Sequence, residues 1–178
     1  MMGGEKNNIQ IITIDGNTEY KVSEDHVELV TSKYPVFSGI DLVYNEVHAQ
    51  ECKELFNNNE YGEHVFEINH CREGRLECNS GDAFFYLTSG DLSIHKKKGK
   101  EHHFYFPSCN YSGISILIDV DKAPRCLSCF LNDVNVQPAL IMNKFCGDDN
   151  HFVARSNIQL EHIFRSYIRY LRRFEKVI

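Results

Sequence analysis

The feature that most constrains the fold is the stretch from Val65 to Ile118, where short apolar-rich segments alternate with glycine-containing turns. These segments are VFEINHCREGRLEC, FFYLTSGDLSIH, HHFYFPS and YSGISILID. Short strands of even spacing predict an antiparallel β domain that is closed or nearly closed into a barrel. Polar residues such as Glu67 and His70 fall inside these strands, at positions where a purely structural strand carries aliphatic side chains. This pattern favours a barrel that holds a ligand.

Alternating apolar and polar residues extend the β pattern toward the N-terminus. We expect strands at Ile9–Ile14, near Tyr20–Val22 and at Ile40–His48, since each has the two-residue period of a strand. Within the Val65–Cys78 segment, Gly74 is expected at or near the bend of a hairpin. Residues 1–123 are therefore predicted to form the barrel together with an N-terminal arm.

Helical spacing replaces the strand pattern after Pro124. The predicted helices cover Pro124–Asn132, Pro138–Phe145 and Ser156–Lys176, and two of them open with a proline, which the first turn of a helix tolerates. The fold class is therefore mainly β with C-terminal α, and residues 124–178 are predicted to form a helical dimerisation or linker segment.

The last predicted helix carries apolar residues spaced alternately four and three apart, which is the seam of a short coiled coil. Two interpretations remain open: the seam packs on the chain's own barrel, or it forms an antiparallel helix–helix contact in a dimer. The candidates for the dimer contact are Leu160, Phe164, Tyr167 and Leu171.

Charge and composition narrow the classes of partner. The 178-residue chain has a net charge of −6, which argues against a broad basic face that grips a phosphate backbone. The segment from Arg155 onward nevertheless carries +4 and the remainder −10, so the tail is chemically distinct. A solvated outer helix face is the favoured explanation of these basic residues.

The sequence also bears on location. No stretch approaches the roughly 20 apolar residues that span a bilayer, and the start MMGGEKNN lacks the features of a signal peptide. Seven cysteines without a secretory leader do not predict a disulfide framework. We therefore expect a cytoplasmic protein with no membrane partner.

Several segments resemble the N-terminal effector-sensing domain of AraC-type bacterial transcriptional regulators. They are GIDLVYNEVHA, FEINHCREGRLEC, YLTSGDLSI, the FP and YSGISILID pair, and LEHIF, with HCREGRLE and SGDL the most telling. The match covers roughly Ser38 to Tyr167. The resemblance implies a cupin-like barrel that binds a small-molecule effector, helices that form a homodimer, and a separate helix-turn-helix module that binds promoter DNA. No segment here resembles that module, so we expect promoter DNA to be bound only through a C-terminal domain absent from this chain.

A cupin-fold enzyme and a stand-alone metabolite-binding protein are the alternatives. Metal-dependent cupins use two His and a Glu from one hairpin, followed by a later His. Glu67 and Gly74 match the E-x6-G part of that motif, but residues 60–63 lack the two His and the segment after Gly113 is aliphatic. We therefore expect no catalytic residue, no metal, no cofactor and no enzyme activity.

Two further clusters of potential metal ligands have simpler explanations. His95 together with His102 or His103 has the composition of a zinc site, but a solvated hairpin is favoured, because adjacent strand residues point to opposite faces. Cys126 and Cys129 have the spacing of half a zinc site, and structural burial is favoured for them.

The pocket is expected where polar side chains share a strand face. Tyr44, Glu46 and His48 share one face of the Ile40–His48 strand, and His70 shares a face with Phe66 and Ile68. If both faces point into the barrel, they form a pocket with apolar walls and a few polar groups. Arg72 and Arg75 suit a ligand carboxylate or phosphate, while surface ion pairs with Glu73 or Glu77 are the alternative. The sequence leaves open whether the bend at Gly74 changes which residues of this segment face the interior of the barrel. The ligand-binding candidates are Tyr44, Glu46, His48, Glu67, His70, Arg72 and Arg75.

Overall fold

The structure is a computed structural model that describes residues 8–24, 26–52, 61–80, 83–97, 103–127, 135–147 and 151–175. Within these ranges the chain forms eleven strands and two helices. The strands are β1 (Asn8–Ile14), β2 (Asn17–Glu24), β3 (Val27–Phe37), β4 (Ile40–His48), β5 (Glu51–Cys52), β6 (Val65–Ser80), β7 (Ala83–Thr88), β8 (Asp91–Lys96), β9 (His103–Tyr105), β10 (Tyr111–Asp119) and β11 (His151–Arg155). The helices are α1 (Pro138–Phe145) and α2 (Ile158–Glu175).

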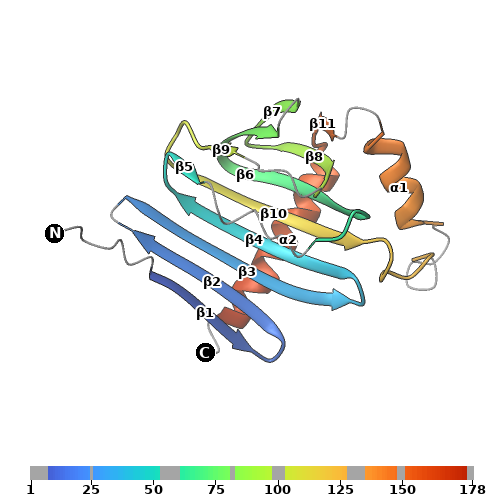
Figure 1. The fold of residues 1–178 in the computed structure, drawn as a ribbon, viewed down its shortest axis with the longest axis horizontal. Helices are drawn as coiled ribbons and strands as arrows, with labels where there is room; N and C mark the ends of the chain where they lie inside the picture. Colours follow the sequence, from blue (N-terminus) through green and yellow to red (C-terminus); the bar gives the residue numbers. More distant parts are fainter. Residues whose placement is uncertain are drawn as a thin grey trace.

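Most strands belong to one antiparallel sheet with the order β1-β2-β3-β4-β10-β6-β8-β11. The second half of β6 leaves this sheet and pairs with β7 on one side and β9 on the other, and β9 also pairs with β5. Figure 1 shows α2 crossing behind the main sheet, with β5, β7 and β9 gathered at one end. The mainly β, antiparallel prediction is confirmed. The sheet is an open half-barrel, however, because β1 and β11 pair with no further strand of the described residues.

Strand β6 joins the two sheets through a bulge at Arg72. Its pairing with β10 matches Cys71 to Gly113 and Glu73 to Ser112, so Arg72 is an extra residue with no partner on β10. Gly74 follows with a positive φ of 81°. The hairpin predicted over Val65–Cys78 is therefore wrong: this segment is one continuous bent strand. A bulge and a hairpin bend both place glycine within a β pattern, and the sequence alone does not separate them.

Three apolar clusters fill the structure. The first lies between the two sheets and includes Leu29 and Val47 from the main sheet and Leu76 and Leu87 from the smaller one. The other two lie on the opposite face of the main sheet, one beneath α1 and one beneath α2. We call the face covered by α1 and α2 the helix face, and the face covered by the smaller sheet the inner face.

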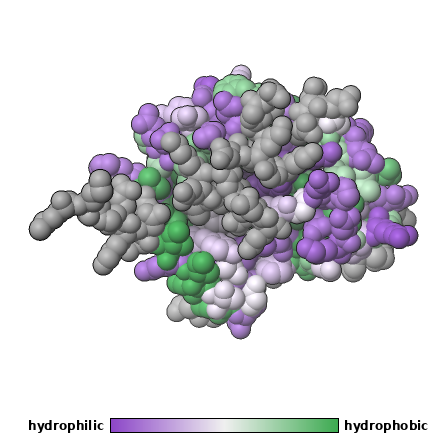
Figure 2. Space-filling model, viewed as in Figure 1, coloured by the Kyte–Doolittle hydropathy of each residue, from purple (hydrophilic) through white to green (hydrophobic). Residues whose placement is uncertain are grey.

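The β1–β2 hairpin leaves apolar side chains on the surface. Ile9 and Ile11 of β1 are more than half exposed, and Figure 2 shows hydrophobic surface gathered over this hairpin. Among the described residues, neither helix combines the length and the apolar character that a membrane crossing requires.

The C-terminal elements partly follow the sequence pattern. Helix α1 has the predicted bounds, and α2 begins two residues later than predicted. Residues 124–127 are not helical, and 128–132 lie outside the described residues, as do residues 1–7 of the expected N-terminal arm. Strand β11 was not predicted; it pairs with β8, so the segment after residue 124 returns to the sheet. Strand β3 was also missed.

The close approach at the β6 bulge gives a first prediction. A Cβ at Gly74 would lie 1.9 Å from the backbone oxygen of Asn110, whereas a Cβ at Gly16, which has the same φ, would meet nothing within 4 Å. Gly16→Ala is expected to lower the free energy of unfolding by about 1–2 kcal/mol through the left-handed backbone alone. Gly74→Ala is expected to lower it by about 1–3 kcal/mol more, because the strand must shift. Urea denaturation measures both, and equal losses would contradict the role assigned to the close approach.

Candidate functional site

The two faces of the main sheet separate the predicted ligand-binding residues. Ile114 of β10 pairs with both Tyr44 and His70, so these side chains share the helix face. Glu67 lies an odd number of residues before His70 on the same strand and therefore points to the inner face. The condition that the Tyr44 and His70 faces both point into the barrel is not met, because α2 covers that face. One pocket cannot contain both Glu67 and His70.

On the inner face, Glu67 is the centre of a buried ion cluster. Its Oε2 lies 3.2 Å from His95 Nε2 and 2.9 Å from Lys97 Nζ, and all three side chains are at most 7% exposed. Burial alone would raise the pKa of Glu67, but the positive charge of Lys97 and the hydrogen bond and charge of His95 together lower it well below its usual range. His95 is thus a buried ion-pair partner and not part of a solvated hairpin.

Neighbouring polar groups on the inner face also pair with one another. Tyr111 Oη donates to Asn69 Oδ1 at 3.0 Å, and Thr31 Oγ1 donates to Asn45 Oδ1 at 2.9 Å. No group of three or more His, Cys, Asp or Glu side chains in the described part of the chain is arranged to hold a metal ion. Cys126 is partly exposed, which differs from the expected burial, and Cys129 lies outside the described residues. Three other polar atoms of this face, His95 Nδ1, Ser93 Oγ and Ser115 Oγ, are buried with no hydrogen-bond partner among the described residues, so the network is only partly satisfied.

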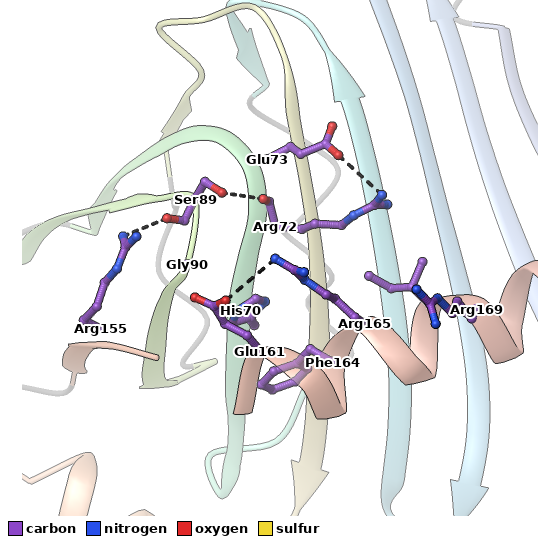
Figure 3. Close-up of a pocket in the computed structure, with 11 residues that line it drawn as sticks. His70, Arg72, Glu73, Ser89, Gly90, Arg155, Glu161, Phe164, Arg165 and Arg169 are labelled. Atoms are coloured by element: carbon purple, nitrogen blue, oxygen red, sulfur yellow. Dashed lines mark hydrogen bonds and ion pairs between the residues drawn. The ribbon is translucent and has the colours of Figure 1, made fainter. Parts of the chain in front are cut away.

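On the helix face, a cleft of about 650 Å³ opens between the sheet and α2. Its walls are the middle of β6, the turn between β7 and β8, the end of β11 and the part of α2 from Glu161 to Arg169 (Figure 3). Four arginines and two glutamates line it, which gives a local excess of positive charge in a protein of net charge −6. The lining residues are His70, Arg72, Glu73, Ser89, Gly90, Arg155, Glu161, Phe164, Arg165, Ile168 and Arg169.

One side of the cleft is held by hydrogen bonds around the β7–β8 turn. Arg155 Nη1 donates to the Ser89 carbonyl at 2.7 Å and to Asp91 Oδ1 at 3.1 Å. Asp91 Oδ2 accepts from the amide and hydroxyl of Thr88. Burial opposes ionisation of Asp91, but the Thr88 hydrogen bonds and Arg155 lower its pKa overall. Ser89 Oγ donates to the Arg72 carbonyl at 2.6 Å, so the turn also fixes the bulge.

The other three arginines are loosely held. Arg72 lies 3.4 Å from Glu73 Oε1 and 3.5 Å from Tyr44 Oη, and Arg165 lies 3.7 Å from Glu161. Within the part of the chain that the structure describes, no carboxylate lies within ion-pair distance of Arg169. Figure 3 shows Arg72 and Arg165 on opposite walls of the cleft, one on β6 and the other on α2. These guanidinium groups are available to a ligand at little cost.

His70 lies in the wall of the cleft, with a buried ring. It is 5% exposed and stacks on Phe164 of α2, with ring centroids 4.4 Å apart and an angle of 11°. Neither ring nitrogen has a hydrogen-bond partner among the described residues. Burial lowers the pKa of His70, against the opposing influence of Glu161 and Asp91, so the ring is neutral at pH 7. A buried imidazole with two unsatisfied nitrogens is unusual and requires an explanation.

The structure thus brings together two of the seven predicted ligand-binding residues. His70 and Arg72 line the cleft, and Tyr44 contacts Arg72. Glu46 and His48 lie on β4 outside the cleft lining. Arg75 pairs with Glu77 at 2.8 Å, which is the surface ion pair named as its alternative.

Sequence reasoning missed the contribution of the C-terminal elements. Arg155 comes from the unpredicted strand β11, and Arg165 and Arg169 were assigned to a solvated helix face. A signal was present, because Glu161, Arg165 and Arg169 follow one another at four-residue spacing and therefore share a side of the helix.

No known family model matches the sequence, and no curated protein matches it. Among solved structures, the EutQ protein of Clostridium difficile is similar at 15% identity over 54% of this chain and 66% of that chain, with a TM-score of 0.41. A cupin 2 conserved barrel domain protein from Salinispora arenicola is similar at 19% identity over 51% and 76% of the two chains, with a TM-score of 0.39. The AraC-like transcriptional activator CuxR is similar at 12% identity over 64% and 39%, with a TM-score of 0.38. Similarities at these TM-scores carry no argument about function.

The inner-face ion cluster gives a prediction about stability. Glu67→Gln leaves Lys97 and His95 without their buried carboxylate, and the free energy of unfolding is expected to fall by about 3–5 kcal/mol at pH 7. The matched control is Glu19→Gln, which removes an exposed ion pair with Lys21 and is expected to change stability by less than about 0.5 kcal/mol.

The difference in stability between wild type and Glu67→Gln is expected to depend on pH. The folded-state pKa of Glu67 is below its ordinary value of 4.5, so its contribution to stability is complete above pH 4.5 and is lost as the pH falls toward the folded pKa. Denaturation at several pH values should therefore show the difference between wild type and Glu67→Gln shrinking below pH 4.5. A difference that is constant through this range would contradict the assignment.

Proposed function

We propose that this chain is a small-molecule-sensing and dimerisation domain of the kind found in AraC-type regulators, and that its effector binds in the cleft between the sheet and α2. On this proposal the chain is a binding protein and not an enzyme. Promoter DNA is bound by a helix-turn-helix module outside these residues.

The observation that carries this proposal is that one wall of the cleft lies on the sheet and the other on a helix. A volume of about 650 Å³ lies within the range of small-molecule sites. Arg72 comes from β6 and Arg165 from α2, so a ligand that contacts both holds α2 in one position on the sheet. A ligand shifts a conformational equilibrium only through such differential contacts.

The surface of α2 supports the dimerisation part of the proposal. Phe164 and Ile168 are each 5% exposed and pack on the sheet, so Phe164 is a core residue and not a free dimer contact. Leu160, Ile163 and Tyr167 remain 38–47% exposed along one side of the helix. An apolar line of this kind suits a second copy of the same helix. The side chain of Leu171 lies outside the described residues.

The first test is thermal melting of the chain against sugars, organic acids, phosphorylated metabolites and divalent metals. A ligand that binds the folded state raises the midpoint by mass action. Hydrogen exchange with the compound that raises it is expected to show slower exchange in α2 and around His70 to Glu73. Protection on the inner face around Glu67 and His95 would instead place the ligand elsewhere, and a rise with metals alone would favour the cupin-enzyme alternative.

The second test addresses dimerisation. Leu160→Glu combined with Tyr167→Glu places charges on the exposed apolar line, and the sedimentation coefficient is expected to fall from that of a dimer to that of a monomer. His162→Glu adds a charge on an exposed part of the same helix outside that line and is expected to leave the dimer intact. A wild-type monomer, or a double variant that remains dimeric, would contradict the proposed contact.

A further inference from the structure

We infer that the ligand of the cleft is a small organic anion, recognised through a carboxylate or phosphate group by Arg72, Arg165 and Arg169, with the His70 ring as a neutral hydrogen-bond donor. This inference rests on the proposed function, because it names the chemical class of ligand for that same site.

The balance of charge in the cleft is the first argument. Four guanidinium groups face two carboxylates, and Arg155 is already held by Ser89 and Asp91. Arg72 and Arg165 have only long contacts, with the exposed Glu73 and the partly buried Glu161, and Arg169 has no carboxylate partner among the described residues. Like charges gathered in one concave site repel one another, and an oxyanion relieves that repulsion. Guanidinium groups also match carboxylate and phosphate oxygens in geometry.

His70 supplies the second, independent argument. Its two ring nitrogens are buried without partners in the wall of this cleft. A neutral imidazole has one donor and one acceptor nitrogen, and burying both unpaired is unfavourable. Both nitrogens have almost no exposed surface, so a ligand oxygen reaches the donor nitrogen after a small shift of the ring or of Phe164 opens it to the cleft.

The ion pair between Glu161 and Arg165 is the contact that the anion replaces when it binds. The two groups are 3.7 Å apart, and the Arg165 side chain is 73% exposed, so this ion pair contributes little to stability. An incoming oxyanion replaces Glu161 as the partner of Arg165. Glu161 and Arg165 both belong to α2, so this exchange of partners takes place on the helix that the proposed function couples to the ligand.

Calorimetric titration of the whole chain with matched probes tests the inference. Glucose 6-phosphate, inorganic phosphate and citrate are the anionic probes, and glucose is the neutral counterpart of the first. We expect the anions to bind, glucose not to bind, and added salt to weaken the binding. Arg165→Gln and Arg169→Gln are each expected to weaken anion binding about tenfold or more, because each removes a charge-assisted hydrogen bond. The matched control is Arg125→Gln, which removes the same charge from an exposed position outside the cleft and is expected to change nothing.

A His70→Phe variant separates a binding role from a structural one. Phenylalanine keeps the stack on Phe164 and removes two unpaired nitrogens, so the melting temperature is expected to stay the same or rise. Anion binding is expected to weaken. A variant with unchanged affinity overturns the role assigned to His70.

The remaining outcomes distinguish this inference from the proposed function. Absence of binding by all three anions overturns the inference, as does equal affinity of Arg169→Gln and Arg125→Gln. A neutral compound that protects α2 and the His70 region from exchange, with no anion binding, overturns the anionic class and leaves the sensing proposal standing. Anion binding that protects only the inner face overturns both.

Discussion

The bulge at Arg72 is the constraint on which the rest of the structure depends. One extra residue in β6 changes which side chains face inward, so that Cys71 before it and Leu76 after it both lie in the core between the sheets although they are five positions apart. The same insertion bends the strand, and the positive φ of Gly74 lets it pass the backbone of Asn110. A single strand thereby belongs to two sheets and encloses the first apolar core. It also places Arg72 at the edge of the cleft.

The two polar regions differ in how closely their charged groups are paired. Glu67, His95 and Lys97 pair with one another in a buried cluster, and Asn69 pairs with Tyr111. His95 Nδ1, Ser93 Oγ and Ser115 Oγ on the same face nevertheless have no hydrogen-bond partner among the described residues, so unpaired polar atoms occur in both regions. In the cleft, Arg72 and Arg165 have only long contacts with carboxylates, and neither ring nitrogen of His70 has a hydrogen-bond partner among the described residues. The loosely paired arginines beside a cavity are the observation on which the proposed binding site rests.

Helix α2 joins the proposed site to the proposed dimer contact. Its buried side, with Phe164 and Ile168, fixes it on the sheet, while Arg165 and Arg169 line the cleft and Leu160 and Tyr167 remain exposed. On the proposed function, one side of this helix packs on the sheet, a second contacts the ligand and a third contacts the partner. The residues at four-and-three spacing do not all lie on one of these sides, because Phe164 is buried against the sheet while Leu160 and Tyr167 are exposed. A heptad pattern predicts that a helix has an apolar side. It does not predict which part of the protein, or which partner, packs on that side.

The sequence by itself determined the mainly β class, the strand at Ile40–His48, the bounds of α1 and the amphipathic character of α2, because these follow from the local periodicity of apolar residues. It also singled out His70 and Arg72. Only the tertiary structure decided which face of each strand is covered by a helix, since period-two alternation gives two equivalent faces and a bulge exchanges them. It also decided that Arg155, Glu161, Arg165 and Arg169 meet β6, because β11 pairs with β8 and brings a distant part of the chain to the sheet. Contacts of this range depend on strand pairing, which the local pattern does not encode.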